Sequence, residues 1–99
     1  MASDFKIFWT DEAINNLKYI LDYLVDKWTQ REIDNFKNRL SKLIRLIEQN
    51  PNLFPISQYN YRLRKVVLSR QTTIFYEVSG QMIYIVYLFN NKQNIERVK

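Results

Sequence analysis

Two amphipathic segments follow each other along the chain with almost nothing between them, and no other feature constrains the fold as strongly. Apolar residues recur at three- and four-residue steps in 13–25 and again in 33–47, a spacing that predicts two helices with one buried face each. Thr10-Asp11-Glu12 supplies a cap and first-turn acids for the first helix, and Thr29-Gln30-Arg31-Glu32 is a capping box for the second. Asn50-Pro51 ends the second helix. Because the join is so short, the sequence predicts an antiparallel helical hairpin.

Short runs with strand character lie on both sides of this hairpin. Residues 5–9 precede it, and residues 63–68, 73–78 and 82–89 follow it. Gly80, the only glycine in the chain, lies between the last two runs, where a tight hairpin turn needs backbone freedom. The order strand, helix, helix, strand, strand, strand predicts an α+β fold, because a sheet with one face covered by the helical hairpin buries both sets of apolar residues.

The composition restricts the chemistry open to this chain. It has 99 residues, the size of one compact domain, and we expect residues 1–99 to form a single domain. There is no cysteine and no histidine, so thiolate chemistry is excluded, and the commonest general base and metal ligand is missing. We therefore expect no cofactor and no metal. No apolar run approaches the ~20 residues that span a bilayer, and the first ten residues lack signal-peptide organisation, which favours a cytoplasmic protein without membrane contact.

The positive charge is concentrated in the second half. Residues 1–55 carry eight Lys/Arg and eight Asp/Glu, whereas residues 56–99 carry seven Lys/Arg against only Glu77 and Glu96. The net charge of +5 therefore lies entirely in the C-terminal half. Such segregation indicates either a polyanionic or acidic partner for that half or a solvated basic surface that keeps the protein soluble, and composition alone does not decide between the two.

A series of short motifs runs through nearly the whole chain in a particular order and spacing. They are Trp9-Thr10 with Ala13, Ile20–Tyr23, Asn50-Pro51 with Phe54-Pro55, Arg62–Leu68, Ile74–Val78, Ile83–Phe89 and Asn90–Gln93. No single motif is specific, but together they resemble the RelE/ParE superfamily of toxins from bacterial type II toxin–antitoxin pairs. The resemblance implies a two-helix hairpin packed on a curved, mostly antiparallel sheet of about four strands. It also implies a genetically linked antitoxin that wraps and neutralises the toxin.

The superfamily that the sequence resembles divides by target: RelE-like toxins cleave mRNA in the ribosomal A site, and ParE-like toxins poison DNA gyrase. RelE-like enzymes use lysines and arginines on the sheet and a tyrosine near the C-terminus. Here Arg64 matches a basic position of that pattern, but Val66 and Thr73 stand where the pattern has a lysine and an arginine. Tyr87 lies earlier than the family tyrosine. Residues 64–68 are more similar to the R-x-L-V-V strand of ParE-like members, so the resemblance favours a ParE-like toxin.

Basic and aromatic residues of the second half are the candidates for a site. Arg62, Arg64 and Arg70 share parity, so in an unbroken strand they would point to one face and form a rim around a concave site. The candidates for contact with a target or a phosphate are Arg62, Arg64, Lys65, Arg70, Tyr76 and Lys92. The alternative interpretations are strand charge that discourages edge pairing and, for Tyr76, a core aromatic. Tyr59 and Tyr61 either stack on bases or pack the loop.

Three functions remain open on the sequence, and they leave open whether the protein is an enzyme. The one that the resemblance favours is a toxin that acts on DNA gyrase without chemistry of its own. The second is a metal-independent, ribosome-dependent mRNA endoribonuclease, in which Arg64, Arg70 and Lys92 would hold the scissile phosphate. The third is a non-toxic, basic nucleic-acid-binding module. In each, an exposed sheet edge and a basic groove would recruit an acidic or amphipathic antitoxin segment.

Overall fold

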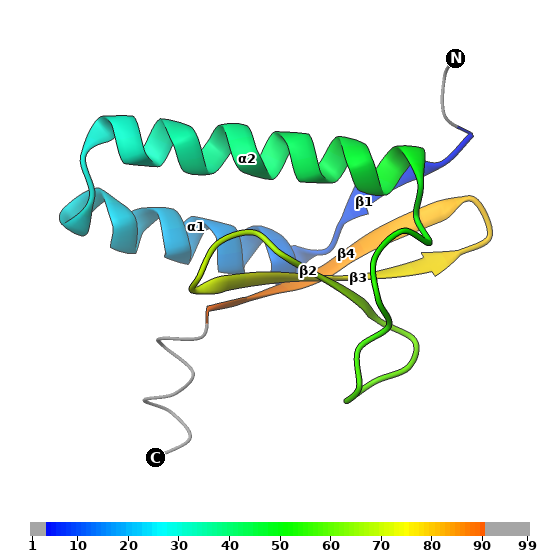
Figure 1. Cartoon of the computed structure of the whole chain (residues 1–99). Helices are drawn as coiled ribbons and strands as arrows, with labels where there is room; N and C mark the ends of the chain where they lie inside the picture. Colours follow the sequence, from blue (N-terminus) through cyan, green and yellow to red (C-terminus); the bar gives the residue numbers. More distant parts are fainter. Residues whose placement is uncertain (1–3, 91–99) are drawn as a thin grey trace.

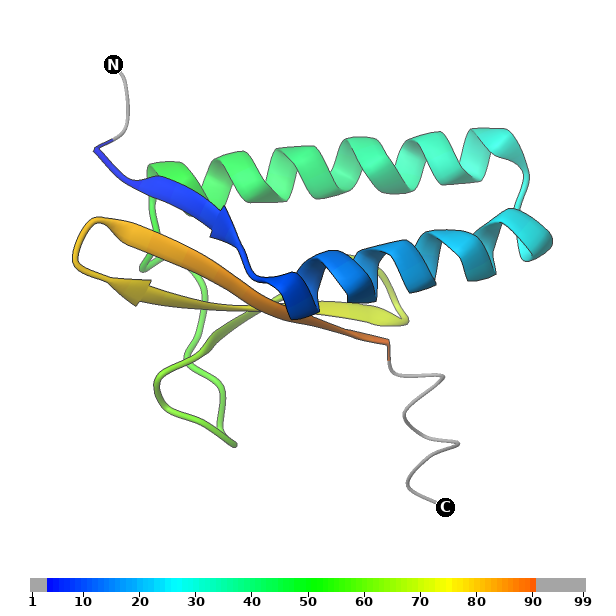
Figure 2. The ribbon, with the colours of Figure 1, turned by 180° about the vertical axis from the view of Figure 1, so that it is seen from behind.

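Two helices cover one face of a four-stranded sheet (Figure 1). The structure is a computed structural model and describes residues 4–90. Its elements follow in the order β1 (Lys6–Trp9), α1 (Asp11–Lys27), α2 (Gln30–Gln49), β2 (Arg64–Val67), β3 (Thr72–Ser79) and β4 (Met82–Asn90). The view from behind shows the same two layers, with both helices on one side of the sheet (Figure 2). This is the α+β architecture that the order of elements predicts.

The sheet is mostly antiparallel, with strand order β1-β4-β3-β2. β3 pairs antiparallel with both β2 and β4, whereas β1, at one edge, runs parallel to β4. Gly80 forms the turn between β3 and β4 with a positive φ of 59°, as its position in the sequence predicts. β2 is shorter than predicted: only Arg64–Val67 pair with β3, which leaves Leu63 and Leu68 outside the strand.

Both helices begin at the predicted caps. Thr10 Oγ1 accepts a hydrogen bond from the N–H of Ala13 at 3.1 Å. At the start of α2 the Thr29 hydroxyl accepts from the N–H of Glu32, and the Glu32 carboxylate accepts from the N–H of Thr29, which completes the capping box. Trp28 ends α1, and its ring meets that of Phe36 edge-on at 6.1 Å. The two helices therefore run antiparallel with only a short link (Figure 1).

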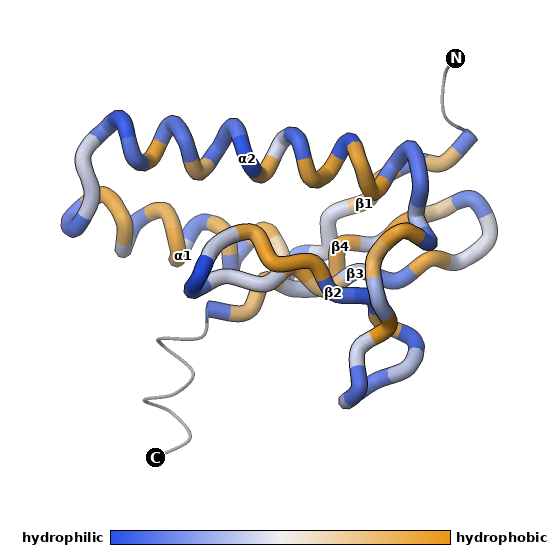
Figure 3. Tube along the Cα trace, in the orientation of Figure 1, coloured by the Kyte–Doolittle hydropathy of each residue, from blue (hydrophilic) through white to orange (hydrophobic). Residues whose placement is uncertain are grey.

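The core lies between the helices and the sheet. Figure 3 shows hydrophobic residues on the side of α2 that faces the sheet and hydrophilic residues on its outer side. Alternation along β3 separates its two faces: Ile74 and Tyr76 are fully buried, whereas Thr73, Phe75 and Glu77 are only half-buried. The latter belong to the face that neither helix covers (Figures 1 and 2), which we call the open face.

One edge of the sheet is covered by the first turns of α1. β4 carries one extra residue, Val86, where its ladder with β3 shifts register, and β1 pairs with β4 only before this bulge. The Thr10 hydroxyl donates a hydrogen bond shared between the carbonyls of Ile85 and Val86, at 3.0 and 2.8 Å. Further along, the N–H of Leu88 donates to Asn16 Oδ1 at 3.0 Å. These contacts occupy the part of β4 that extends past β1.

Candidate functional site

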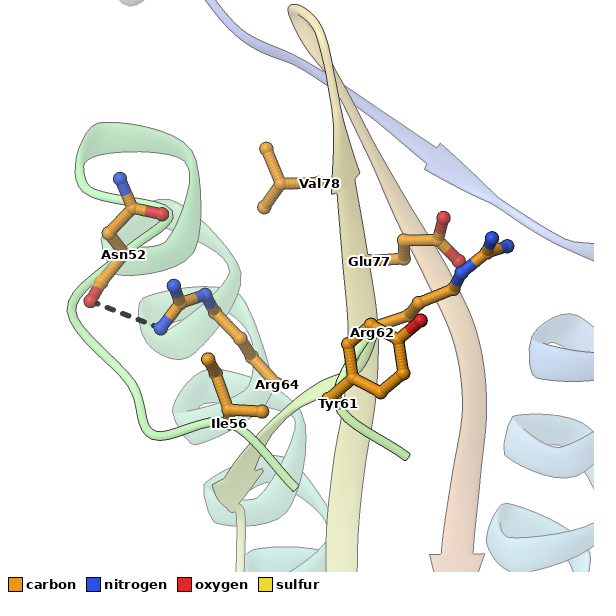
Figure 4. A pocket seen from close by; sticks show the side chains of 7 residues that line it. All are labelled: Asn52, Ile56, Tyr61, Arg62, Arg64, Glu77 and Val78. Atoms are coloured by element: carbon orange, nitrogen blue, oxygen red, sulfur yellow. Dashed lines mark hydrogen bonds between the residues drawn. The ribbon is translucent and has the colours of Figure 1, made fainter. Parts of the chain in front are cut away.

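A pocket of about 380 Å³ lies where β3 extends past β2. The pairing of β2 with β3 begins at Arg64 opposite Tyr76, but β3 continues to Ser79. Within residues 4–90, Glu77–Ser79 therefore pair with β4 alone. We call this pocket the edge pocket; it is lined by Asn52, Ile56, Tyr61, Arg62, Arg64, Glu77 and Val78 (Figure 4).

Arg64 joins the loop after α2 to the sheet. Its Nη1 atom donates to the carbonyl of Phe54 at 2.7 Å and lies 3.5 Å from the carbonyl oxygen of Asn52. The side chain is half-buried, and its guanidinium has five N–H donors, more than these two contacts use. Arg64 therefore supports the wall of the edge pocket and also supplies positive charge to it.

The same loop lies along the outer edge of β2. The N–H of Lys65 donates to the Pro55 carbonyl at 3.0 Å, and the N–H of Ser57 donates to the Leu63 carbonyl at 2.7 Å. This pairing protects the first residues of β2 from other strands. The edge of β3 at the pocket has no such cover among the described residues.

Tyr76 is a core residue and not a surface contact. Its side chain is 0% exposed, and its hydroxyl donates to the carbonyl of Pro51 at 2.7 Å. Burial raises the pKa of Tyr76 to about 12, although the positive charge of Arg64 acts in the opposite direction. The prediction that Tyr76 contacts a target or a phosphate is corrected here, because a buried hydroxyl that donates to the backbone cannot reach a ligand.

Arg62 and Glu77 place opposite charges in the edge pocket. Arg62 is exposed and lies in a turn before β2, where its N–H donates to Asn60 Oδ1 at 3.0 Å. Its guanidinium points toward the carboxylate of Glu77 (Figure 4). Two guanidinium groups beside an open strand edge suit an extended peptide that brings a carboxylate, because the edge pairs with main chain and arginine binds carboxylates with paired hydrogen bonds.

Lys65 points to the opposite face of the sheet from Arg64, because neighbouring residues of a strand alternate. It contributes to a second pocket, of about 330 Å³, lined by Ser57, Tyr59, Asn60, Lys65, Thr73, Phe75, Tyr87 and Phe89 on the open face. We call this the aromatic pocket. The rings of Phe75 and Tyr87 stack with centroids 4.7 Å apart, and Phe89 meets Phe75 edge-on at 6.4 Å. Burial raises the pKa of Tyr87, and the negative charge of Glu12 raises it further.

The aromatic pocket was not predicted from the sequence, although the sequence pattern contains a signal for it. Phe75 lies between two core residues of β3, and Tyr87 and Phe89 flank the buried Leu88 of β4. Aromatic residues that alternate with core residues mark the second face of a sheet. Tyr59 and Tyr61 are 86% and 79% exposed, so the interpretation that they pack the loop is wrong.

The predicted rim of three arginines does not form. Residues of the same parity point to one face only along an unbroken strand, but β2 covers only Arg64–Val67. Arg62 lies in the turn before it, and Arg70 is exposed in the bend that leads to β3, past the other end of the strand. The structure thus brings Arg62 and Arg64 together in the edge pocket and separates Arg70 from them. Lys92 lies outside the described residues.

Across residues 4–90, no three His, Cys, Asp or Glu side chains are grouped so that they would bind a metal ion. None of the described helices has the length and apolar character required to span a membrane.

The comparison with protein families identifies the chain. The model of the ParE toxin of the type II toxin–antitoxin system, parDE, matches residues 7–95. The chain therefore belongs to the ParE toxin family, as its resemblance to the RelE/ParE superfamily implied. A comparison with curated protein sequences finds no match.

Solved structures share this fold. The chain is similar to a protein described as the chromosomal ParDE toxin–antitoxin system from P. aeruginosa, with a TM-score of 0.75 and 18% identity over 90% of this chain and 98% of that chain. It is also similar to a chain of the E. coli DinJ-YafQ toxin–antitoxin complex, with a TM-score of 0.64 and 13% identity over 91% and 96%. The YoeB/ParE toxin from Agrobacterium tumefaciens has a TM-score of 0.62 and 15% identity over 87% and 98%. At these identities the likeness establishes the fold.

Proposed function

We propose that this toxin arrests growth by acting on DNA gyrase and that a cognate antitoxin neutralises it. Membership of the ParE family supports gyrase as the target. The observation that carries the proposal is the separation of the basic side chains on the sheet. Arg62 and Arg64 line the edge pocket, Lys65 lines the aromatic pocket on the other face, and Arg70 lies past the far end of β2.

This separation argues against RNA cleavage. Attack by a 2′-hydroxyl requires a base, a proton donor for the leaving oxygen and cations around a single phosphate. The basic residues of the described sheet are divided between two faces and two ends, so they do not meet at one phosphate. The endoribonuclease alternative would need Arg64 and Arg70 to come together across the length of β2, with Lys92 completing the set.

The tyrosines near these pockets do not supply the missing base. Burial raises the pKa of Tyr76 to about 12, and burial together with the charge of Glu12 raises the pKa of Tyr87. A general base works best when its pKa lies near the operating pH, and both shifts move these hydroxyl groups further from neutrality. Both hydroxyl groups therefore stay protonated under physiological conditions and cannot act as the base.

The edge pocket is where we propose that the antitoxin binds. Glu77–Ser79 present an unpaired strand edge, to which an extended segment of the antitoxin can add as a further strand. Arg62 and Arg64 offer charge-assisted hydrogen bonds to an acidic side chain of that segment. Glu77 disfavours a ligand that is anionic throughout, such as a polyphosphate, because like charges repel. The expected occupant is an extended peptide of mixed charge with an acidic residue at the arginine end.

Induced expression in a bacterial host tests the target. DNA synthesis and translation are labelled separately while mRNA integrity is followed. We expect DNA synthesis to fall with an SOS response while mRNA stays intact, and we expect the full-length chain to inhibit supercoiling by purified gyrase. An early stop in translation with cleaved mRNA would contradict the proposal and favour the endoribonuclease. Unimpaired growth would contradict toxicity.

Two variants with the same loss of charge test the antitoxin site. Arg62→Gln acts at the edge pocket, and Lys18→Gln acts on the exposed side of α1. Arg62→Gln should lower the affinity for the co-purifying product of the neighbouring small gene roughly tenfold, because a hydrogen bond to a charged group contributes about 1.5 kcal/mol or more. This affinity should not change for Lys18→Gln. Equal affinities of the two variants would contradict the site.

A further inference from the structure

The open face of the sheet is aromatic, although neither helix covers it. An antiparallel sheet with one face in the core usually carries polar residues on its other face. Here β3 and β4 place Phe75, Tyr87 and Phe89 on the open face, where they are only half-buried. Phe8 of β1 and Val67 of β2 are exposed on the same face. An uncovered apolar surface of this kind indicates a contact with a partner.

The bulge in β4 turns two of these rings outward. Tyr84 pairs with Glu77 on the open face, so unbroken alternation along β4 would place Tyr87 and Phe89 in the core. The extra residue at the bulge instead pairs Tyr87 with Phe75, and their rings stack with centroids 4.7 Å apart. Bulges often re-aim side chains next to functional sites. The aromatic pocket therefore depends on an irregularity that core packing alone does not require.

The charges on the open face favour a protein partner over a nucleic acid. Within the described strands, pairing places Lys6, Lys65 and Glu77 on this face, so the cations are partly balanced by a carboxylate. A nucleic-acid site needs a set of cations for the phosphates, whereas the centre of a protein–protein contact is rich in aromatic residues and poor in charge. The open face has the second composition.

The aromatic pocket can accept side chains but not a strand. Thr73 and Phe75, which line it, pair with β2 on one side and with β4 on the other. Their main chain therefore has no free edge, in contrast to the edge of β3 at the edge pocket. An occupant has to insert side chains from above the sheet, as the surface of a folded protein does.

The loop before β2 adds a wall and a charge selects the neighbouring group. The segment 57–61 projects on the side of the sheet away from the helices (Figures 1 and 2), and its Tyr59 lines the pocket with the ring largely exposed. Lys65 is the only charged residue that lines the aromatic pocket. An apolar side chain with a carboxylate beside it therefore fits this pocket.

We propose that the aromatic pocket is the surface with which this toxin binds its target, a folded protein that inserts an apolar side chain next to a carboxylate. The inference rests on the proposed function, since it takes DNA gyrase as that target, and it adds the toxin's side of the contact. The two pockets then bind different partners. The edge pocket takes the extended antitoxin segment, and the aromatic pocket, on the opposite face of the sheet, takes gyrase.

Binding of the full-length chain to purified gyrase, measured together with inhibition of supercoiling, tests the proposal. Tyr59→Ala removes the exposed ring from the wall, and Lys65→Gln removes the charge. Each should weaken binding to gyrase roughly tenfold or more, because a tyrosine or a charged contact at the centre of an interface commonly contributes this much. The concentration for half-inhibition should rise by the same factor. The affinity for the antitoxin should stay unchanged, since neither side chain lines the edge pocket.

Tyr19→Ala is the matched control, because it removes an exposed ring from α1, in the helical layer; it should change neither affinity. If both pocket variants inhibit gyrase as wild type does, the inference is overturned while gyrase remains the target. If wild type itself does not inhibit supercoiling, the proposed function fails and the inference with it.

Two further results would assign the aromatic pocket to another occupant and overturn the inference. One is a loss of affinity for the antitoxin in place of gyrase. The other is binding of a labelled single-stranded oligonucleotide that Tyr59→Ala weakens while gyrase inhibition is unchanged. Thermal unfolding verifies that the variants fold, and Lys65→Gln, which keeps every ring of the pocket, carries the test if Tyr59→Ala does not.

Discussion

Replacing Tyr76 with phenylalanine removes a single oxygen from the core and tests how the loop after α2 is held. The hydroxyl is fully buried and donates to the Pro51 carbonyl at 2.7 Å, and Pro51 is itself buried. The variant keeps the ring but leaves this carbonyl without its donor. An unsatisfied buried polar group costs about 1–3 kcal/mol. For a domain of this size 1 kcal/mol corresponds to a change in Tm of about 4–8 °C, so the Tm should fall by at least about 4 °C.

The pH dependence of this loss has a definite sign. Burial raises the pKa of Tyr76 from 10.0 to about 12, so the unfolded chain loses this proton before the folded protein does. The stability from the neutral hydroxyl is complete below pH 10 and is lost as the pH rises to about 12. At 1.36 kcal/mol per pKa unit the loss is at most about 2.7 kcal/mol. Phenylalanine has no proton to lose, so the free energies of unfolding of wild type and variant should converge over this range.

Urea unfolding at several pH values, followed by circular dichroism, measures both effects. Tyr19→Phe is the control, because it removes the same oxygen from a side chain that is 61% exposed; exposed substitutions change stability by no more than about 0.5 kcal/mol. If Tyr76→Phe changes the free energy of unfolding at pH 7 as little as the control does, the buried hydrogen bond is refuted. If the difference in the free energy of unfolding between wild type and Tyr76→Phe stays constant between about pH 8 and pH 11.5, the raised pKa of Tyr76 is refuted.

Further substitutions test the caps, the turn and the loop. Thr29→Ala should lower the free energy of unfolding by about 1 kcal/mol, and Thr10→Ala should lower it more, because the same hydroxyl also donates to β4; equal losses in urea unfolding would contradict the second role. Gly80→Ala should lower the free energy of unfolding by about 1 kcal/mol in the same assay. The cost comes from the backbone, whose φ is 59°, because nothing lies within 4 Å of the added Cβ. Gly80→Asn should lower the free energy of unfolding less, because asparagine tolerates this backbone region better. Arg64→Lys keeps the charge but not the planar fork, so amide exchange in residues 51–56 should increase, and unchanged exchange would show that the contacts with the loop are dispensable.

The sequence by itself determined the local parts of this protein. Both caps, the short link between the helices and the turn at Gly80 depend on residues within a few positions of each other, so local chemistry was sufficient to predict them. The burial of one helix face follows in the same way from its repeat. These local features, taken in order along the chain, were also sufficient to indicate the fold class and the superfamily.

Only the tertiary structure decided which side chains share a site. The period of two that assigns strand residues to faces holds only while the strand is unbroken and in register. β2 ends too early to align Arg62, Arg64 and Arg70, and the bulge at Val86 lets both Ile85 and Leu88 face the core. Tyr76 finds its hydrogen-bond partner 25 residues away. Such contacts depend on where distant segments meet, which is set by the packing of the whole chain and leaves no mark in the spacing of neighbouring residues.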